Sequence, residues 1–463
     1  MYKLFYRPSE PNSAAADFIP FYKDGTFHLF YLFDHRNNSK YGEGVTWHKI
    51  ETKDFLNFID KGEMLPRGSK SDYDMYCFTG DVIEHKSKYH IFYTGHNVHI
   101  KTYGHQNEVV MHAISDDLDN WEKIPEDTFF APPGYDPCDF RDPFVYYDKT
   151  NELFYMLLCA RKNDCNALRN GETIRMKSVD LKKWEFDKSI YAPRAFQTHE
   201  CPDLFQMGDL WYLIFSEYSD RSVTCYRISE SPDGPWKKPK NDTFDGRAYY
   251  AAKTAYDGNK RYLFGWIPTR MNNKDNGAWM WGGNLVIHEL NTNSMGELLV
   301  SPPQNLIDVF NKEIYKNQFT LSEPFGCKVK NIYKDAPSTC LLSFTATASE
   351  RCDKFGVLIK QNEIEDNAYE FRFDLANNTL YANRFPCLPQ NEFSTYQLHR
   401  KLKKADQYDV KLFIDNDIFV IYVNDEIALS LRVYENLGNG LGLYVGEGMV
   451  QFEKISLKEI KEF

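Results

Sequence analysis

The chain has 463 residues, with 55 Lys and Arg against 66 Asp and Glu and a formal net charge of −11. Nucleic acids and anionic membrane surfaces require a basic face on the proteins that bind them, so this balance excludes both as the main partner and leaves an uncharged partner open. No stretch of the sequence has the roughly 20 consecutive apolar residues that a transmembrane helix needs.

The first two thirds of the chain contain an internal repeat. Segments that end in an aromatic residue after an acidic turn stop at Phe58, Trp121, Trp184 and Trp236, at intervals of 63, 63 and 52 residues. Short aromatic and aliphatic runs typical of strands keep the same spacing; they cover residues 28–32, 90–94, 153–157, 210–214 and 261–265. Five all-strand units of about 50 to 60 residues predict a five-bladed β-propeller.

The repeat stops after Ser301-Pro302-Pro303. From about residue 317 onward the sequence shows short alternating strands, such as 369–374 and 409–414, separated by polar turns, which predicts a β-sandwich. We therefore predict an all-β chain with two domains: a five-bladed propeller, residues 1–305, and a C-terminal β-sandwich, residues 306–463, that begins with a short linker and has a structural role.

Acidic residues recur where the innermost strand of each predicted blade begins. Asp17, Asp81, Asp142 and Asp203 open four of these strands, and Glu200 precedes the last of them by three residues. A single Asp at such a position is explained equally well as a turn cap. Several carboxyls around one axis raise each other's pKa, so together they indicate a functional site.

Two motifs carry a resemblance to a known family. Arg141-Asp142-Pro143 is similar to the RDP motif, and 200–205 (ECPDLF) to the ECPDLF motif, of glycoside hydrolase family 32, the invertase, inulinase and levanase group. The motifs fall 58 residues apart, in consecutive predicted blades. Further segments resemble family patterns: 77–80 (FSG), 249–254 (YAxQ), 263–266 (LFGW), 281–290 (the end of the propeller) and Trp47 (WGH).

The resemblance implies a retaining double displacement at an anomeric carbon, for which two carboxyls lie about 5–5.5 Å apart. Asp17 is then the nucleophile, Glu200 the acid and base, and Asp142 the group that holds the ring hydroxyls and stabilises the charged transition state. The predicted substrate-binding residues are Trp47, Phe78, Thr79, Asp81, Arg141, Cys201, Tyr250 and Trp281.

The motif around Asp17 departs from the family. The family's WMNDPNG appears as 14–20 (AAADFIP), so alanines replace the Trp and Asn that contact the sugar, and Asp81 stands where Ser is usual. We expect these changes to enlarge the pocket and to remove hydrogen bonds that select one sugar. The prediction is an unusual β-fructofuranosidase-like enzyme that cleaves terminal β-fructofuranosyl or related furanosyl linkages, with fructosyl transfer as a possible second activity.

Two alternatives remain open at this point. One is an arabinofuranosidase-like enzyme of the related five-bladed families, which inverts and needs carboxyls about 6.5–9.5 Å apart. The other is a carbohydrate-binding propeller without turnover, although the retention of three mutually repelling carboxyls argues against it. In each case we expect a carbohydrate partner, no nucleic acid, no membrane, and a monomer or homodimer.

We expect no cofactor and no metal, because the family's chemistry needs neither. His96, His99 and His105 lie in one segment, which we expect to face solvent or substrate rather than a metal. Residues 1–7 lack the apolar segment of a signal peptide, and the ten cysteines show no CxxC pairs. These features predict reduced cysteines and a cytoplasmic location; a secreted chain that has lost its signal peptide is the alternative.

Overall fold

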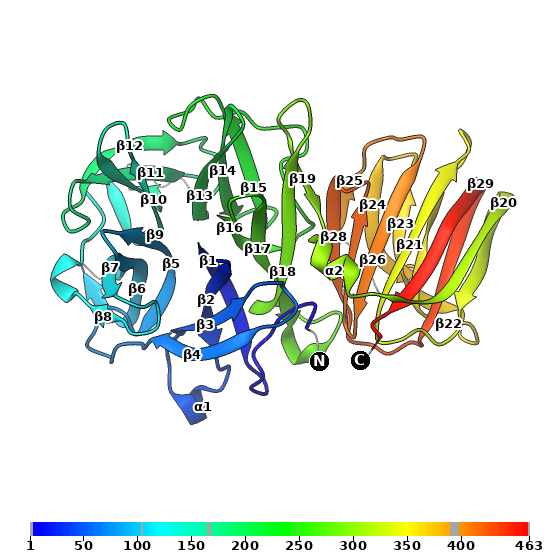
Figure 1. Cartoon of the computed structure of the whole chain (residues 1–463), viewed down its shortest axis with the longest axis horizontal. Coiled ribbons are helices and arrows are strands. Elements are labelled where there is room, and N and C mark those ends of the chain that lie inside the picture. Colours follow the sequence, from blue (N-terminus) through cyan, green and yellow to red (C-terminus); the bar gives the residue numbers. More distant parts are fainter. Residues whose placement is uncertain (1–2, 103–104, 164–167, 248, 389–397, 462–463) are drawn as a thin grey trace.

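The computed structural model describes residues 3–102, 105–163, 168–247, 249–388 and 398–461. Figure 1 shows two domains side by side, both built mainly of strands, which are arranged around an axis in the first and layered in a sandwich in the second. This architecture confirms the predicted fold of a five-bladed propeller followed by a β-sandwich. No helix among the described residues is long and apolar enough to span a membrane.

Each propeller blade is an antiparallel sheet whose strands follow one another in the sequence. The fourth has three strands and two isolated bridges outside them, and the others have four. The blades are β1–β4 (Ala14–Lys23, Thr26–Asp34, Thr46–Thr52, Ile59–Leu65), β5–β8 (Tyr76–His85, Lys88–Thr102, His105–Ser115, Glu122–Lys123), β9–β12 (Tyr135–Asp148, Leu153–Lys162, Gly171–Ser178, Glu185–Tyr191), β13–β15 (His199–Met207, Leu210–Glu217, Val223–Ser229) and β16–β19 (Tyr250–Tyr256, Arg261–Arg270, Trp279–Thr292, Leu298–Ser301).

The ring closes between the first and last blades, where Ala15 of β1 pairs with Gly283 of β18. The segment before β1 reinforces this joint, because the Tyr6 carbonyl accepts a hydrogen bond from the Leu285 N–H. Within the described ranges, four short helical turns connect strands: α1 (Asn38–Tyr41), η1 (Pro125–Asp127), η2 (Met271–Asn273) and α2 (Gln304–Asp308).

Every innermost strand has a break in register at the same position relative to its neighbour. The last paired residues before the break form a first ring around the axis: Ala16, Phe78, Arg141, Glu200 and Tyr250. The residues that follow form a second ring: Asp17, Thr79, Asp142, Cys201 and Ala251. Four members of the second ring, all except Thr79, have a positive φ of 46° to 60°. A bulge of this kind re-aims side chains, which lets two successive residues face the axis.

A third ring lies farther along the strands and contains Ile19, Asp81, Phe144, Asp203 and Lys253. Its acids join neighbouring blades. Asp81 accepts a hydrogen bond from the Val145 N–H at 2.8 Å, and Asp203 accepts one from the Thr254 N–H at 2.5 Å. Lys253, which is 1% exposed, lowers the pKa of both carboxyls and donates to the Gly80 carbonyl at 2.7 Å.

The C-terminal domain is one hydrogen-bonded network folded into a sandwich around β29, which pairs with β22 through its first half and with β21 through its second. Its core is dominated by aromatic and aliphatic side chains, including the stacked rings of Phe355 and Phe373. The strands are β20 (Lys312–Tyr333), β21 (Thr339–Ala348), β22 (Lys354–Asn362), β23 (Asn367–Asp374), β24 (Thr379–Phe385), β25 (His399–Lys401), β26 (Tyr408–Asp415), β27 (Ile418–Val423), β28 (Ile427–Arg432) and β29 (Gly440–Glu459).

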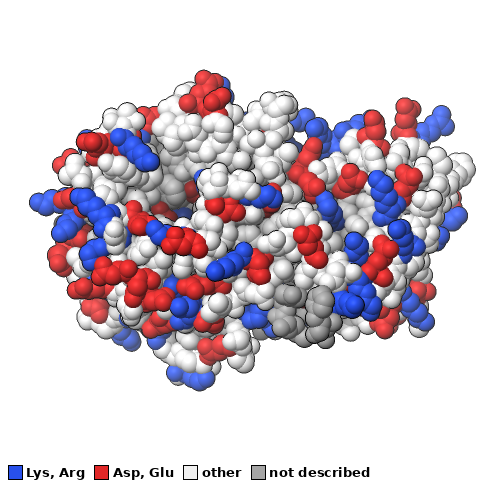
Figure 2. Space-filling model, in the orientation of Figure 1, with Lys and Arg blue, Asp and Glu red and all other residues white. Residues whose placement is uncertain are grey.

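The two domains meet through buried polar contacts between the propeller and β27–β28. Asp245 accepts hydrogen bonds from the backbone and side chain of Ser430, and His288 bonds to the Tyr422 hydroxyl at 2.8 Å. Buried polar groups that are this well paired hold two surfaces in one arrangement. Figure 2 shows acidic and basic side chains interspersed over one face of both domains, with a hollow at the centre of the propeller.

The third ring yields a stability prediction. Substituting Lys253→Met should destabilise the fold by about 3–5 kcal/mol, because it leaves Asp81 buried without its cation and leaves Asp203 with Arg261 alone. The loss should be larger at pH well above 6 than well below it, since burial raises the pKa of Asp81 to about 6 and the protonated carboxyl needs no cation. Denaturant unfolding at several pH values measures both effects.

The matched control is Lys260→Met. Lys260 forms an ion pair with Glu289 at 2.8 Å, but its side chain is 39% exposed, so its loss should cost only about 0–1 kcal/mol. Equal destabilisation by the two substitutions, or a Lys253→Met effect that does not vary with pH, contradicts the assignment of Lys253 as the partner of the buried acids.

Candidate active site

Eight of the ten residues in the first two rings line a pocket at the mouth of the propeller, with a volume of about 880 Å³; the exceptions are Ala16 and Ala251. This lies at the upper end of the range for small-molecule sites, about 300–1,000 Å³. The structure brings nine of the eleven predicted site residues to this pocket: Asp17, Phe78, Thr79, Arg141, Asp142, Glu200, Cys201, Tyr250 and Trp281.

Trp47 and Asp81 do not line the pocket among the described residues, so the geometry does not support the substrate contacts predicted for them. Trp47 is fully buried behind Phe78 and donates its indole N–H to the Phe78 carbonyl at 3.0 Å, which fixes the pocket wall from behind. Asp81 belongs to the third ring, beyond the bulge, where it joins two blades. An offset of two residues along the strand, from Thr79 to Asp81, separates the two environments.

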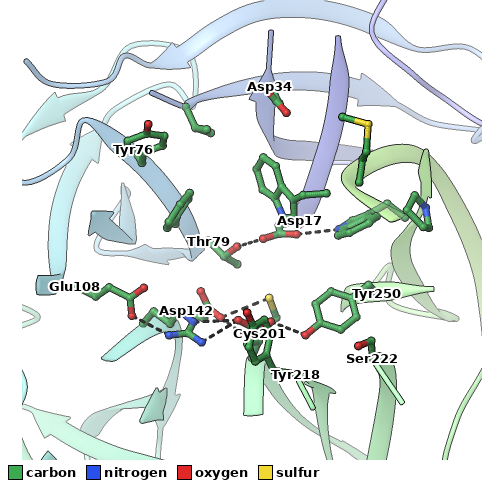
Figure 3. Close-up of a pocket in the computed structure, with 18 of the residues that line it drawn as sticks. Asp17, Asp34, Tyr76, Thr79, Glu108, Asp142, Cys201, Tyr218, Ser222 and Tyr250 are labelled. Atoms are coloured by element: carbon green, nitrogen blue, oxygen red, sulfur yellow. Dashed lines mark hydrogen bonds and ion pairs between the residues drawn. The ribbon is translucent and has the colours of Figure 1, made fainter. Parts of the chain in front are cut away.

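Asp17 lies on the pocket floor between two hydrogen-bond donors (Figure 3). The Thr79 hydroxyl donates to Oδ2 at 2.5 Å, and the Trp266 indole N–H donates to Oδ1 at 2.8 Å. Burial raises the pKa of Asp17 to about 7, and the charges of Asp142 and Glu200 add to the rise, whereas the two donors oppose it. Because each donor binds one of the two carboxylate oxygens, together they fix the orientation of the carboxylate.

Glu200 faces the same pocket and is held by Arg141 and Tyr250. Arg141 donates to Oε1 from Nε at 3.2 Å and from Nη2 at 2.9 Å, and the Tyr250 hydroxyl donates to Oε2 at 2.5 Å. Burial raises the pKa of Glu200, the charge of Asp142 raises it further, and Arg141 and Tyr250 act in the opposite direction. A buried carboxyl with a raised pKa is the kind of group that serves as a general acid near neutral pH.

Asp142 completes the group from the neighbouring blade. Its Oδ2 accepts a hydrogen bond from the Cys201 N–H at 2.9 Å, and its own N–H donates to the Thr94 hydroxyl at 2.8 Å. These contacts span three blades and hold Asp142 in its left-handed conformation, with φ of 60°. Three carboxyls from three blades therefore surround one small volume, as Figure 3 shows for Asp17 and Asp142.

Sequence reasoning missed several residues that line the pocket. Glu108 lies on β7 and is 6% exposed, and its Oε2 accepts from Arg141 Nη1 at 2.9 Å. The available signal was an acid directly before the apolar run Val109-Val110-Met111 in a strand. Trp266 was included only as part of a family-like segment, yet it contacts Asp17 directly. Other pocket residues without a sequence signal are Asp34, Tyr76, Asp139, Tyr218 and Arg247.

Gly282 fills the space beside the alanines that replace the family's Trp and Asn. A Cβ placed on Gly282 would lie 3.2 Å from the Ala14 Cβ and 3.3 Å from the Ala16 Cβ, so the Gly282 backbone packs directly on both methyl groups. The expected enlargement of the pocket at this point stays a prediction. The residues just before Gly282 supply new lining side chains: Trp279, Met280 and Trp281.

The C-terminal domain holds this rim segment in place through Asp275. Asp275 accepts a hydrogen bond from the Tyr369 hydroxyl and another from the Tyr434 N–H at 2.7 Å. The Arg270 guanidinium donates to the Asp275 carbonyl at 2.5 Å and lies 3.7 Å from the centre of the Trp279 ring. Residues of the sandwich thus anchor a segment that forms part of the propeller's pocket.

Comparisons with known proteins identify the family of the chain. The family model described as the glycosyl hydrolases family 32 N-terminal domain matches residues 18–303, and the family 32 C-terminal model matches residues 311–459. The chain belongs to glycosyl hydrolases family 32. The predicted family resemblance is confirmed, and the chain is a glycosidase.

The family relatives cover nearly the whole chain at low identity. A raffinose invertase from Escherichia coli is 24% identical over 92% of this chain and 88% of its own, and a levanbiose-producing levanase from Bacillus subtilis (strain 168) is 24% identical over 95% and 87%. Among solved structures, an exo-inulinase from Aspergillus awamori has a TM-score of 0.78 at 18% identity and covers 99% of this chain and 98% of that one. At this identity the structural match shows the shared fold.

The contacts of Asp17 predict a shift in pH dependence. Replacing Thr79→Val removes a hydroxyl that lowers the pKa of Asp17, so the pKa should rise from about 7 and the acidic limb of glycosidase activity should move to higher pH. Thr79→Ser keeps the hydroxyl and should leave the limb in place. Profiles of kcat/KM against pH for the three proteins measure the shift, and identical limbs in all three contradict the role of this hydrogen bond.

The rim anchor predicts that a sandwich residue affects substrate binding. Substituting Tyr369→Phe removes the donor to Asp275 and should loosen Trp279–Trp281, raising KM for an oligosaccharide about three- to tenfold with a smaller change in kcat. Tyr381→Phe, on the adjacent strand β24, is the matched control and should change neither constant. Steady-state kinetics decide the matter, and an unchanged KM for Tyr369→Phe contradicts the anchor.

Proposed function

We propose that this chain is a retaining glycosidase that removes terminal β-fructofuranosyl groups from oligosaccharides. The observation that supports this best is the convergence of Asp17, Asp142 and Glu200 on one buried pocket, with hydrogen-bond donors arranged around Asp17 and Glu200. Relatives named invertase, sucrose-6-phosphate hydrolase and levanase share the family, which favours a fructoside as substrate.

In the first step Asp17 attacks the anomeric carbon while Glu200 gives its proton to the leaving oxygen, which produces a fructosyl ester on Asp17 and a free alcohol. The Thr79 hydroxyl and Trp266 indole stabilise the Asp17 carboxylate before attack and orient it. As Glu200 loses its proton, Arg141 compensates the new charge from 2.9 Å.

In the second step the Glu200 carboxylate removes a proton from water, which attacks the ester carbon and releases the sugar with retained configuration. Asp142 accepts hydrogen bonds from hydroxyl groups of the sugar and stabilises the positive charge that develops on the ring. If a second sugar takes the place of water, the same site performs fructosyl transfer. The exposed side of the pocket, with Tyr76, Phe78 and Trp281, suits the rest of the oligosaccharide.

The arabinofuranosidase-like and binding-only functions are the alternatives, and the monomer or homodimer state and the cytoplasmic location stay predictions. The relatives' names favour fructosides over arabinofuranosides. The contacts favour turnover over binding alone, because burying several carboxyls in one pocket is costly and a sugar-binding site does not need it.

Incubating the protein with sucrose, 1-kestose, inulin, levan and an aryl arabinofuranoside tests this function. We expect release of fructose from one or more fructosides. Glu200→Gln should reduce kcat/KM by roughly a hundred- to ten-thousandfold, and Asp17→Asn should abolish turnover. Asp148→Asn, at the far end of the strand that carries Asp142, is the control and should retain full activity.

Methanol as acceptor tests retention, because it traps the product as a stable methyl fructoside. The β anomer is expected, and its NMR spectrum identifies it. Formation of the α anomer means inversion, and release of arabinose without fructose supports the arabinofuranosidase alternative. Sugar-dependent thermal stabilisation without any released product supports a binding protein.

A further inference from the structure

Arg141 is shared between three carboxyls, of which only one belongs to the proposed reaction. Its Nη1 donates to Glu108 Oε2 and to Asp139 Oδ1, both at 2.9 Å, while Nε and Nη2 donate to Glu200 Oε1. Its Nη2 also reaches the Thr198 hydroxyl at 3.2 Å. The guanidinium therefore uses its whole donor fork and has no freedom to approach one carboxyl without changing its contacts to the others.

The charges around Arg141 are unevenly matched. Asp139 has a cation of its own, because Arg161 Nε donates to its Oδ2 at 2.5 Å. Glu108 and Glu200 are left to share the single charge of Arg141; Glu108 is buried, and the Glu200 side chain is 16% exposed. Two largely desolvated carboxyls around one cation hold a proton between them over part of the pH range, and the ionisation of one alters the proton affinity of the other.

The surroundings of Glu108 contain few other groups that stabilise its charge. The Phe140 N–H donates to Oε2 at 3.1 Å, and His96 Nδ1 lies 3.9 Å from Oε1, with its own pKa lowered by burial. Asp139 and Asp142 face it with like charge. Arg141 is thus the main cation of Glu108, and burial nevertheless raises the pKa of Glu108 to about 7.

We propose that Glu108 is a positioning residue that shares Arg141 with Glu200 and thereby sets how tightly Glu200 holds the proton it gives to the leaving group. This inference rests on the proposed function of Glu200. When Glu108 is ionised it takes up part of the charge of Arg141, so Glu200 receives less compensation and keeps its proton to higher pH. Glu108 lies on strand β7 of a different blade from Glu200, so residues of more than one blade take part in one proton transfer.

The experiment compares Glu108→Gln with wild type by the pH dependence of kcat/KM on sucrose. Removing the Glu108 charge leaves Arg141 to Glu200 alone, so Glu200 should lose its proton more easily and the alkaline limb should move to lower pH, by about one pH unit. Glu108→Asp keeps the charge and should move the limb less. The control is Glu172→Gln, a buried carboxyl on β11 that bonds to Tyr135 and lies near Lys162 instead of Arg141, and it should leave the limb in place.

A second substrate separates an effect on the acid from an effect on binding. With an aryl fructofuranoside whose leaving group needs no protonation, the alkaline limb of kcat/KM should be weak in both wild type and Glu108→Gln. A higher KM on sucrose with an unmoved limb overturns the inference, because it makes Glu108 a binding residue only. A limb that moves equally in Glu172→Gln also overturns it, because any buried carboxyl then has the same effect.

The Glu200→Gln variant, measured in the same experiment, distinguishes a failure of the proposed role of Glu200 from a failure of the inference about Glu108. If Glu200→Gln cleaves sucrose as fast as wild type, the proposed role of Glu200 fails and the inference fails with it. If Glu200→Gln is inactive on sucrose and Glu108→Gln leaves the limb in place, only the inference fails. Thermal unfolding of each variant over the same pH range shows whether the observed limb reports catalysis or loss of the fold.

Discussion

The bulge in each innermost strand is the constraint on which the site depends. A regular strand turns alternate side chains away from the axis, so it offers one residue per blade at a given depth. The bulge brings two successive residues to the pocket, and this is how Arg141 and Asp142 face it together, and likewise Glu200 and Cys201. The left-handed conformations that this requires are held by hydrogen bonds from the neighbouring blades.

The same geometry separates two kinds of buried acid. Asp142, in the second ring, lines the pocket, whereas Asp81 and Asp203, in the third, use their carboxyls to join blades and are compensated by Lys253 and, for Asp203, by Arg261 as well. A carboxyl that is satisfied by a backbone N–H and a buried cation contributes to the fold. A carboxyl that faces a cavity beside other acids stays available to a ligand, which is useful for chemistry.

The sequence predicted the propeller well because its signals are local: turns, aromatic runs and a regular interval. The same interval identified Asp17, Asp142 and Glu200 as residues near one axis. It did not distinguish Asp81 from them, because the distinction depends on which side of the bulge a residue lies. The interval between repeats in the sequence does not show where the strand register shifts. Glu108 was missed for another reason: it lies on the third strand of its blade, whereas the repeat drew attention to the innermost strands.

The alanines in the motif around Asp17 are matched by the residues of the Gly282 segment that pack against them. Ala14 and Ala16 leave space for the Gly282 backbone, and the positive φ of Gly282, 74°, suits a residue without a side chain. The Arg36 guanidinium fixes the same segment by donating to the Trp281 carbonyl at 2.6 Å. Trp279 and Trp281 then line the pocket, and Asp275 ties their segment to the sandwich, so blade five supplies the aromatic surface that alanines beside the nucleophile cannot provide. The sandwich therefore helps to shape a pocket that lies entirely on the propeller.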